Sequence, residues 1–372
     1  MSTQATLRTH DSITTPLLGF GLMRLPQKDG KIDRATAQSM VDKAISSGFN
    51  YFDTAYFYHG GESEEFIGEA LSKYPRESYI LTTKFPVGSA ETEADVERIF
   101  NHQLEKTRAG YFDFYLMHAL GAGGWEKAKK LHLPEFFRAK KAEGKIRHMG
   151  FSFHDSPEAL AKIVSEFEWE IVQIQLNYED WDRGRAGEQY AILEKAGLPV
   201  LIMEPLKGGV LANLNEEARG ILREAVPEAG IASWGLRFAA SLPGVQVVLS
   251  GMSAPLQMEE NIRTFSPFQP LSDGERATLA KALEAFRRTG RIPCTGCRYC
   301  MPCPAGVDIP GNLALHNRLK SGEALETVKA DYDARPDGVK ADKCVSCHSC
   351  LPKCPQKLQI SMLMRGVRDA FK

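Results

Sequence analysis

The sequence predicts an α/β protein: a (β/α)8 TIM barrel followed by a small, mainly helical domain. Three observations carry this prediction. Apolar runs of strand length alternate with segments of helical periodicity through the first 290 residues. Eight such rounds are present, which is the number that closes a TIM barrel. All eight cysteines lie between Cys294 and Cys354, so the last part of the chain is built differently.

The predicted strands follow one another at regular intervals. After a short β segment in LLGFGLM (17–23), they are YFDTA (51–55), YILTTKF (79–85), FDFYLMH (112–118), IRHMGFSF (146–153), IVQIQLN (171–177), PVLIMEP (199–205) and VQVVLSG (245–251). These runs are almost continuously apolar, as is typical of parallel strands buried on both faces. A doubly wound open sheet is the alternative, but it normally needs fewer rounds, and no GxGxxG turn follows any strand here.

The boundary between the two domains is predicted near RRTGRIPC (287–294). Before it, SDGERATLAKALEAFRR has the pattern of a last amphipathic helix, capped by Ser272 or Asp273. Between the two groups of cysteines, IPGNLALHNRLKSGEALETVKADYD has helical character. We therefore expect a TIM barrel over residues 1–290 and a small helical domain over residues 291–372.

Composition and charge exclude several classes of protein. The chain is 43% hydrophobic and 25% charged, as globular proteins are, and its 46 basic residues nearly balance 47 acidic ones. This balance gives no electrostatic case for binding nucleic acid or an anionic membrane surface. The N-terminus lacks the apolar segment of a secretory signal, and no apolar run approaches the ~20 residues of a membrane span. We expect a cytoplasmic protein, in which clustered cysteines indicate a metal centre and not disulfides.

Polar side chains stand at the carboxyl ends of seven predicted strands: Asp53, Lys84, His118, Ser152, Gln173 or Asn177, Glu204 and Ser250. A barrel brings these ends together on one face, where its active site is built. Each residue alone has an ordinary explanation, since a lone lysine is usually a surface residue and a lone histidine is usually hydrogen-bonded in a core. Polar residues at seven strand ends together predict a catalytic face.

Four of the polar residues suit the reduction of a carbonyl group, which needs a hydride on carbon and a proton on oxygen. Tyr58 lies five residues after Asp53 and is the candidate proton donor. A phenol is a weak acid, with a pKa of about 10, and a neighbouring ammonium such as Lys84 lowers that value. Asp53 would hold Lys84 in place, and His118 would orient the carbonyl oxygen.

These residues and their order resemble the aldo-keto reductase family. That family's catalytic tetrad is Asp, Tyr, Lys and His, with the Asp-to-Tyr spacing seen here in FDTAYFY, the lysine in LTTKF and the histidine in YLMH. The resemblance covers roughly residues 15–265 and includes GFGLMRLP and ESEEFIGEAL. It implies a reductase of small-molecule carbonyl substrates, and catalytic roles for Asp53, Tyr58, Lys84 and His118.

The resemblance also implies a nicotinamide site. In the family a Ser-Asn pair and a Gln hold the carboxamide; here Ser152 and Gln173 match, and Phe153 stands in place of the Asn. A tyrosine usually stacks on the nicotinamide after the seventh strand, where this chain has Met203. For the rest of the cofactor, the segment LSGMSAPLQMEEN contains no basic residue. The candidate contacts in this segment are Ser250, Gly251, Ser253, Gln257, Glu260 and Asn261. We therefore expect NADP(H) or NAD(H) without a strong preference for the phosphorylated form.

The cysteines form two runs, CTGCRYCMPCP and CVSCHSCLPKCP. The second has the bacterial ferredoxin spacing C-x2-C-x2-C-x3-C-P, and the first is one residue short before its final Cys-Pro. Zinc is the alternative, but three thiolates at two-residue intervals suit one corner of a cubane better than a tetrahedral ion. In the two-cluster ferredoxin pattern the runs exchange their fourth ligand, which gives the sets Cys294, Cys297, Cys300 and Cys354, and Cys344, Cys347, Cys350 and Cys303.

The whole chain resembles predicted aldo-keto reductases that carry a C-terminal 4Fe-4S ferredoxin-type domain. This implies an oxidoreductase with two 4Fe-4S clusters. A nicotinamide delivers two electrons together and a cluster passes one, so coupling them calls for a flavin or a redox partner such as ferredoxin, unless the clusters are structural. Two alternatives remain: a barrel that is fed by ferredoxin and no longer uses NAD(P)H, and a module that docks onto a larger redox complex.

Overall fold

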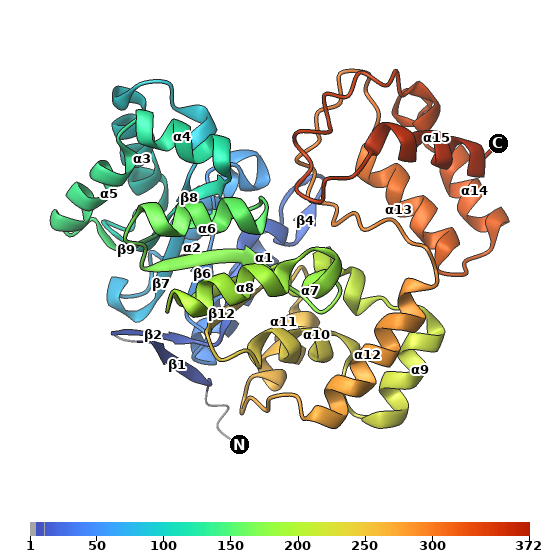
Figure 1. Cartoon of the computed structure of the whole chain (residues 1–372), viewed down its shortest axis with the longest axis horizontal. Coiled ribbons are helices and arrows are strands. Elements are labelled where there is room, and N and C mark those ends of the chain that lie inside the picture. The colour runs from blue at the N-terminus through green and yellow to red at the C-terminus, as the bar shows by residue number, and fades with distance from the viewer. Residues whose placement is uncertain (1–4, 11) are drawn as a thin grey trace. The chain divides into compact units, whose positions relative to one another are not determined.

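The computed structural model describes residues 5–10 and 12–372 (Figure 1). These residues form two compact units. The first comprises the described part of Met1–Pro205 together with Ser233–Leu271, and it holds all the strands assigned in the described residues. The second comprises Leu206–Ala232 and Ser272–Lys372 and is helical.

The first unit contains a closed barrel of eight parallel strands, in the order β10-β11-β12-β3-β6-β7-β8-β9. The strands are β3 (Leu18–Gly21), β6 (Tyr51–Asp53), β7 (Ile80–Phe85), β8 (Phe112–Leu120), β9 (Ile146–Phe153), β10 (Ile171–Gln175), β11 (Val200–Met203) and β12 (Val245–Ser250). Consecutive strands are neighbours all the way around, and β12 pairs with β3 to close the ring. The predicted (β/α)8 TIM fold is therefore confirmed.

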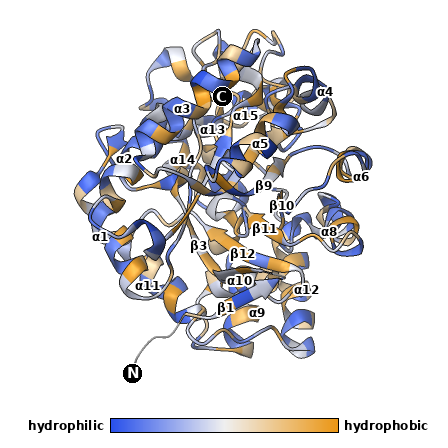
Figure 2. Ribbon diagram, turned by 90° about the vertical axis from the view of Figure 1, so that its left-hand side faces the viewer, coloured by the Kyte–Doolittle hydropathy of each residue, from blue (hydrophilic) through white to orange (hydrophobic). Residues whose placement is uncertain are grey.

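Apolar side chains from several strands fill the barrel. Tyr51, Leu116, Ile171 and Val247 belong to one buried cluster although they come from four different strands. Gly19 on β3 makes room for it, since a Cβ there would lie 2.8 Å from Val247 and 2.9 Å from Tyr51. Figure 2 shows hydrophobic residues along β11 and β12, as expected for strands that are covered on both faces.

Helices follow the strands along this part of the chain: α1 (Arg34–Ser46), α2 (Glu62–Leu71), α3 (Glu93–Thr107), α4 (Ala122–Lys130), α5 (Leu133–Ala142), α6 (Pro157–Glu166), α7 (Asp180–Arg183), α8 (Ala186–Lys195), α10 (Ile231–Ala240) and α11 (Pro255–Thr264). A hairpin of β1 (Leu7–His10) and β2 (Ile13–Pro16) precedes the barrel, and β4 (Gln27–Lys28) pairs with β5 (Lys31–Ile32). Among the described residues, no helix combines the length and the apolar character needed to cross a membrane.

The second unit is built from α9 (Glu216–Ala225), α12 (Asp273–Arg287), α13 (Ile309–Lys320), α14 (Leu325–Asp333) and α15 (Ile360–Ala370). Ser272 caps α12 through a reciprocal capping box with Glu275, as one of the two predicted caps. The cysteine loops and the last three helices share a core that includes Val307, Leu313 and Met364. The predicted small helical domain is confirmed, and a functional boundary at residue 290 stays a prediction.

The segment after β11 belongs to the second unit because it packs on the first cysteine loop. Gly208 has a φ of +66°, and a Cβ at this position would collide with the backbone carbonyl of Thr295. Two residues before the first cysteine, Ile292 exchanges two hydrogen bonds with the Asn317 side chain of α13, each 2.8 Å long. These contacts fix the entry of the chain into the cysteine-rich region.

Candidate functional site

Three of the predicted catalytic residues meet at the carboxyl end of the barrel. Asp53 ends β6, and Lys84 lies one residue before the end of the neighbouring β7. Lys84 Nζ donates hydrogen bonds to Asp53 Oδ1 at 2.6 Å and to the Thr54 carbonyl at 2.8 Å. The Tyr58 hydroxyl lies 3.5 Å from the same nitrogen. Since Lys84 is only 1% exposed, the strands hold its ammonium group in place beside the phenol and away from bulk water.

Gln173 on β10 holds the second oxygen of Asp53. Its Nε2 donates to Asp53 Oδ2 at 3.1 Å, so both carboxylate oxygens are engaged. Burial raises the pKa of Asp53, and the contacts with Lys84 and Gln173 oppose that rise. Gln173 Oε1 is buried and makes no hydrogen bond within the described residues. An unsatisfied buried acceptor fits a ligand that brings an N–H group, such as the amide of a nicotinamide.

A buried polar network supports Lys84 from behind, and sequence reasoning missed it. Glu64 on α2 is fully buried and accepts a hydrogen bond from Thr83 at 2.6 Å, another from Gln103, and an ion pair from Lys106 at 3.0 Å. Gln103 Nε2 also lies 3.1 Å from the Lys84 carbonyl. The network therefore fixes the backbone of β7 at the residue that carries the ammonium group.

The expected lowering of the Tyr58 pKa by Lys84 is wrong for this arrangement. Burial raises the pKa of Tyr58 well above its usual value, and the negative charges of Asp53 and Glu204 raise it further; only Arg24 opposes the rise. The physical reason is that burial disfavours the charged phenolate, and that Asp53, which pairs with Lys84 at 2.6 Å, brings a negative charge close to the phenol. Tyr58 is therefore a protonated phenol at neutral pH, which is the state that a proton donor needs.

Two histidines accompany the tetrad. The His118 ring lies 6.1 Å from the Tyr58 ring at an interplanar angle of 81°, so the fourth predicted residue joins the group. Burial, Lys84 and His154 hold the pKa of His118 well below its usual value. Burial and Lys84 lower the pKa of His154 to about 4. Both rings are therefore neutral at physiological pH. His154 follows the matched Ser152 by two residues, and its type was the only sequence signal for it.

An ion pair between Arg24 and Glu204 brings a positive charge to a place where the sequence suggested none. Arg24 Nη2 lies 2.5 Å from Glu204 Oε1, and the two side chains are 24% and 14% exposed. A Cβ on Gly251 would lie 3.3 Å from the Arg24 side chain, and Ser253 Oγ donates to the Arg24 carbonyl at 2.7 Å. A basic residue thus lies beside the segment after β12, but it comes from the loop after β3. The glutamate partner balances its charge.

The nicotinamide candidates next to the tetrad are only partly free. Ser152 Oγ accepts a hydrogen bond from the Ala119 N–H at 2.8 Å, which leaves its hydroxyl hydrogen for a ligand. Phe153 is 1% exposed and packs at 6.2 Å against Phe151, so it offers no polar contact. Met203 ends β11 and is partly exposed. A carboxamide would thus have Ser152 and Gln173 as partners.

The candidates after β12 mostly contact one another. Ser250 Oγ accepts from Asn261 Nδ2 at 2.9 Å, which ties α11 to the end of β12. Gln257 Oε1 accepts from the Ser253 N–H at 2.8 Å. Glu260 is exposed on α11. A phosphate at this position would therefore meet neutral groups and the balanced Arg24.

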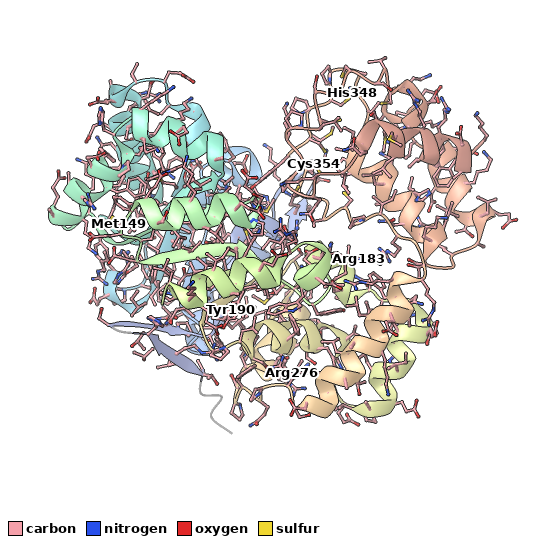
Figure 3. The ribbon with its side chains drawn as sticks, in the orientation of Figure 1. Met149, Arg183, Tyr190, Arg276, His348 and Cys354 are labelled. Atoms are coloured by element: carbon pink, nitrogen blue, oxygen red, sulfur yellow. The ribbon has the colours of Figure 1, made fainter. Side chains whose placement is uncertain are left out.

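Two cavities in the second unit are each lined by four cysteines. One is lined by Cys294, Cys297, Cys300 and Cys354, and the other by Cys303, Cys344, Cys347 and Cys350. These are the two exchanged sets that the ferredoxin pattern implies, and Cys354, labelled in Figure 3, is the residue that crosses from the second run to the first cavity. Ile309 and Ile360 line both cavities with apolar side chains.

The arrangement of thiols favours a cluster over zinc. A single zinc ion would need its four sulfurs about 2.3 Å from one centre. Four thiols around a cavity fit a larger body such as a 4Fe-4S cubane, which takes one thiolate at each iron.

The model of the "Aldo/keto reductase family" matches residues 17–284. The chain belongs to this family. A second model, the "4Fe-4S dicluster domain", matches residues 293–358, which contain all eight cysteines. The aldo-keto reductase barrel is therefore followed by a ferredoxin-type iron-sulfur domain, and the protein is an oxidoreductase of the aldo-keto reductase type.

Similar proteins include two curated bacterial oxidoreductases and a solved aldo-keto reductase structure. The chain is 28% identical over 276 residues to "Uncharacterized oxidoreductase YqkF" of Bacillus subtilis, covering 66% of this chain and 86% of that protein. It is 24% identical over 333 residues to "NADH-specific methylglyoxal reductase" of Escherichia coli, covering 74% and 97%. Among solved structures, "aldo-keto reductase AKR11C1 from Bacillus halodurans (holo form)" has a TM-score of 0.64 at 24% identity, covering 75% of this chain and 96% of that one.

Proposed function

We propose that the barrel reduces the carbonyl group of a small aldehyde or ketone with a nicotinamide cofactor. One observation carries the proposal: Lys84 Nζ lies between Asp53 at 2.6 Å and the Tyr58 hydroxyl at 3.5 Å, at the carboxyl end of a barrel. This is a phenol beside a cation that is held in place, which suits proton transfer to an oxygen that gains negative charge.

Tyr58 is the proton donor in this proposal. Its raised pKa keeps the phenol protonated at neutral pH. As the carbonyl oxygen gains charge, the phenol gives up its proton, and Lys84 stabilises the phenolate that remains. Oxidation of an alcohol would instead require the phenolate as a base.

His118 orients the carbonyl oxygen in this proposal. Because its pKa is held well below the usual value, the ring is neutral and donates a hydrogen bond without carrying charge. A neutral ring beside Lys84 also avoids repulsion between two cations. The oxygen would thus accept hydrogen bonds from Tyr58 and His118 together.

A bound nicotinamide would supply the hydride to the carbonyl carbon. The unsatisfied Gln173 Oε1 would accept from the carboxamide NH2, and the Ser152 hydroxyl would donate to its oxygen. Met203 would pack against the ring in place of a stacked tyrosine. Gln173 also donates from its Nε2 to Asp53, so it would link the bound cofactor to the ion pair between Asp53 and Lys84.

We further propose that neither NADPH nor NADH is strongly preferred. Strong selection of the 2′-phosphate usually rests on an unpaired arginine, and the nearby Arg24 is balanced by Glu204. The Escherichia coli relative is named NADH-specific, while a neighbouring Klebsiella pneumoniae structure, 22% identical with a TM-score of 0.59, is a complex with NADPH. Known relatives thus include users of either form.

Titration of the anaerobically purified protein with NADH and NADPH tests the cofactor proposal. Isothermal calorimetry should give dissociation constants that differ by no more than about tenfold, since neutral hydrogen bonds to a phosphate contribute about 1 kcal/mol each. Failure of both cofactors to bind would refute this proposal. It would favour a barrel that receives electrons through the clusters.

We also propose that each four-cysteine cavity holds one 4Fe-4S cluster. This gives about eight irons per chain and a brown protein with broad visible absorbance. Zinc without iron after anaerobic preparation would refute it. The described residues give no support to a flavin, and the proposal does not include one.

A second candidate function is electron transfer from a ferredoxin through the clusters to the barrel. Phe153 and Met203 favour it, because they remove two of the usual contacts to nicotinamide. The buried Gln173 Oε1 favours the first candidate. The calorimetric titration distinguishes the two.

A further inference from the structure

Exposed apolar side chains border the cavity of the second cysteine set. Val345 is 70% exposed although it follows Cys344, and Met362 on α15 is 67% exposed. Val345 and Ser361 line the same cavity as Cys303 and Cys347, and Met362 follows Ser361 directly. Val345 is therefore an exposed apolar side chain in the lining of the site that we assign to a cluster, and Met362 is a second exposed apolar side chain on the helix that contributes Ser361 to it. Isolated exposed apolar residues are common, so the surrounding charge decides what this edge means.

The edge is positively charged. Arg365 lies three residues after Met362 on α15 and so on the same side of the helix. It is exposed and has no ion pair among the described residues. Arg365 and Arg368 also line a hollow of about 470 Å³ together with Cys344 and Val345. We call Val345, Met362, Arg365 and Arg368 the cluster rim.

The negative charges near the cluster rim are balanced locally. Asp342, which lines the hollow, lies 3.0 Å from Lys343, and Asp369 lies 3.0 Å from both Arg368 and Lys372. Residues 341–372 contain six Lys or Arg and two Asp or Glu, whereas the whole chain has 46 and 47. The excess of positive charge thus belongs to this C-terminal segment, which contains the rim, and not to the protein as a whole.

We propose that the cluster rim is the docking site of an acidic one-electron carrier protein, an inference that rests on the proposed cluster in the second cavity. Weak redox complexes use small interfaces with an apolar centre and a charged border. Val345 and Met362 supply the centre, and Arg365, which forms no ion pair among the described residues, supplies charge that steers an acidic partner. The partner's redox centre would then lie next to the loop of Cys344 and Cys347. Cys347 is an exposed cysteine, so this loop brings the proposed cluster close to solvent.

Other occupants fit the rim less well. A second copy of the same rim would bring like charges together, which is unfavourable. Nucleic acid would need a broader basic surface, and only two of the four rim residues are basic. A small apolar centre with positive charge beside it fits a folded acidic protein best.

The test measures binding of an acidic two-cluster bacterial ferredoxin to the iron-loaded full-length protein by surface plasmon resonance. Binding should weaken at least tenfold between 50 and 300 mM salt. Over this range the Debye length falls from ~14 Å to ~6 Å, so salt screens the attraction between the two proteins. Arg365→Glu should weaken it about tenfold or more at low salt, and Met362→Gln should weaken it at every salt concentration. Cytochrome c, a basic carrier, should not bind.

The matched control is Lys320→Glu, which changes the net charge by the same amount as Arg365→Glu. Lys320 is exposed at the end of α13, eleven residues and so about 16 Å along the helix from Ile309 at the cavities. It should leave ferredoxin binding unchanged, and all variants should keep the iron content of the parent. Equal effects of Lys320→Glu and Arg365→Glu, or preferential binding of a short DNA duplex, would overturn the docking site. If the protein contains its iron but does not bind the ferredoxin, the docking site is overturned and the proposed clusters are not. If the purified protein contains no iron, the proposed clusters are refuted as well.

Discussion

Arg24 Nη2 and Glu204 Oε1 lie 2.5 Å apart at the carboxyl end of the barrel, within electrostatic reach of Tyr58. The pair joins the loop after β3 to the residue that follows β11. It gives the site a cation and an anion whose charges cancel. Both cofactor preference and the acidity of the proton donor depend on that balance.

Removing the carboxylate should create a preference for NADPH. In Glu204→Gln the Arg24 guanidinium beside Gly251 is no longer balanced by the Glu204 carboxylate, so its charge attracts a phosphate more strongly. We expect the ratio of NADH to NADPH dissociation constants to rise about tenfold relative to the parent protein. The control is Arg24→Gln, which should leave the ratio near that of the parent. An unchanged ratio in Glu204→Gln would mean that Arg24 does not reach the cofactor.

The same substitution should shift the pH dependence of reduction. Glu204 raises the pKa of Tyr58, and reduction is lost as pH rises through that pKa because the phenol loses its proton. Without the negative charge the pKa is less raised, so the alkaline limb of kcat/KM should move to lower pH. A pH profile from 6 to 11 with methylglyoxal as the probe substrate checks this. A limb that moves to higher pH would contradict the assignment of Tyr58 as the acid.

Breaking the Lys84–Asp53 pair on one side should destabilise the barrel. The two side chains are 1% and 5% exposed, and removing one partner of a buried pair costs roughly 3–5 kcal/mol. We expect the free energy of unfolding to fall by that amount in Lys84→Met, and by less in the double variant Lys84→Met/Asp53→Asn. The coupling energy between the two substitutions should be at least about 1 kcal/mol. Urea unfolding followed by tryptophan fluorescence reports on the first unit, which contains all four tryptophans. Additive losses would show that the pair does not act as a unit.

The crossed cysteine sets predict how paired substitutions combine. Cys297 and Cys354 line the same cavity. Each single variant, Cys297→Ser or Cys354→Ser, should therefore lose about half of the total iron, and the double variant should lose no more than that. Cys347 lines the other cavity, so Cys347→Ser combined with Cys354→Ser should lose nearly all the iron. Iron content and visible absorbance after anaerobic purification measure both. If instead the first pair of substitutions removes all the iron, each run binds its own cluster.

Local spacing made much of the site predictable. A parallel barrel brings strand ends together whatever fills the loops, so Asp53, Lys84 and His118 could be placed from their positions at strand ends. The two cysteine runs were recognisable from their spacing, and the division into exchanged sets followed from their resemblance to the two-cluster ferredoxin pattern. In both cases the chemistry lies within a few residues of a recognisable pattern.

Long-range pairing was not predictable in the same way. Arg24 and Glu204 are 180 residues apart, and neither lies in a pattern that points to the other. The contacts of Glu64 with Gln103 and Lys106 depend on how α2 and α3 pack. The pKa of Tyr58 was predicted in the wrong direction, because the sequence shows that a lysine is near but not how deeply the phenol is buried or that Glu204 lies within electrostatic reach.

The central claim is that Tyr58 protonates a carbonyl oxygen while a nicotinamide supplies hydride to the carbon. The most direct measurement is a single-turnover reaction of the anaerobic protein with NADH deuterated at C4 and methylglyoxal, with mass spectrometry of the product. The account predicts one deuterium on the reduced carbon with the parent protein, and a rate at least about a hundredfold lower with Tyr58→Phe, which should still bind NADH. Product without deuterium, or a near-normal rate for Tyr58→Phe, would contradict it.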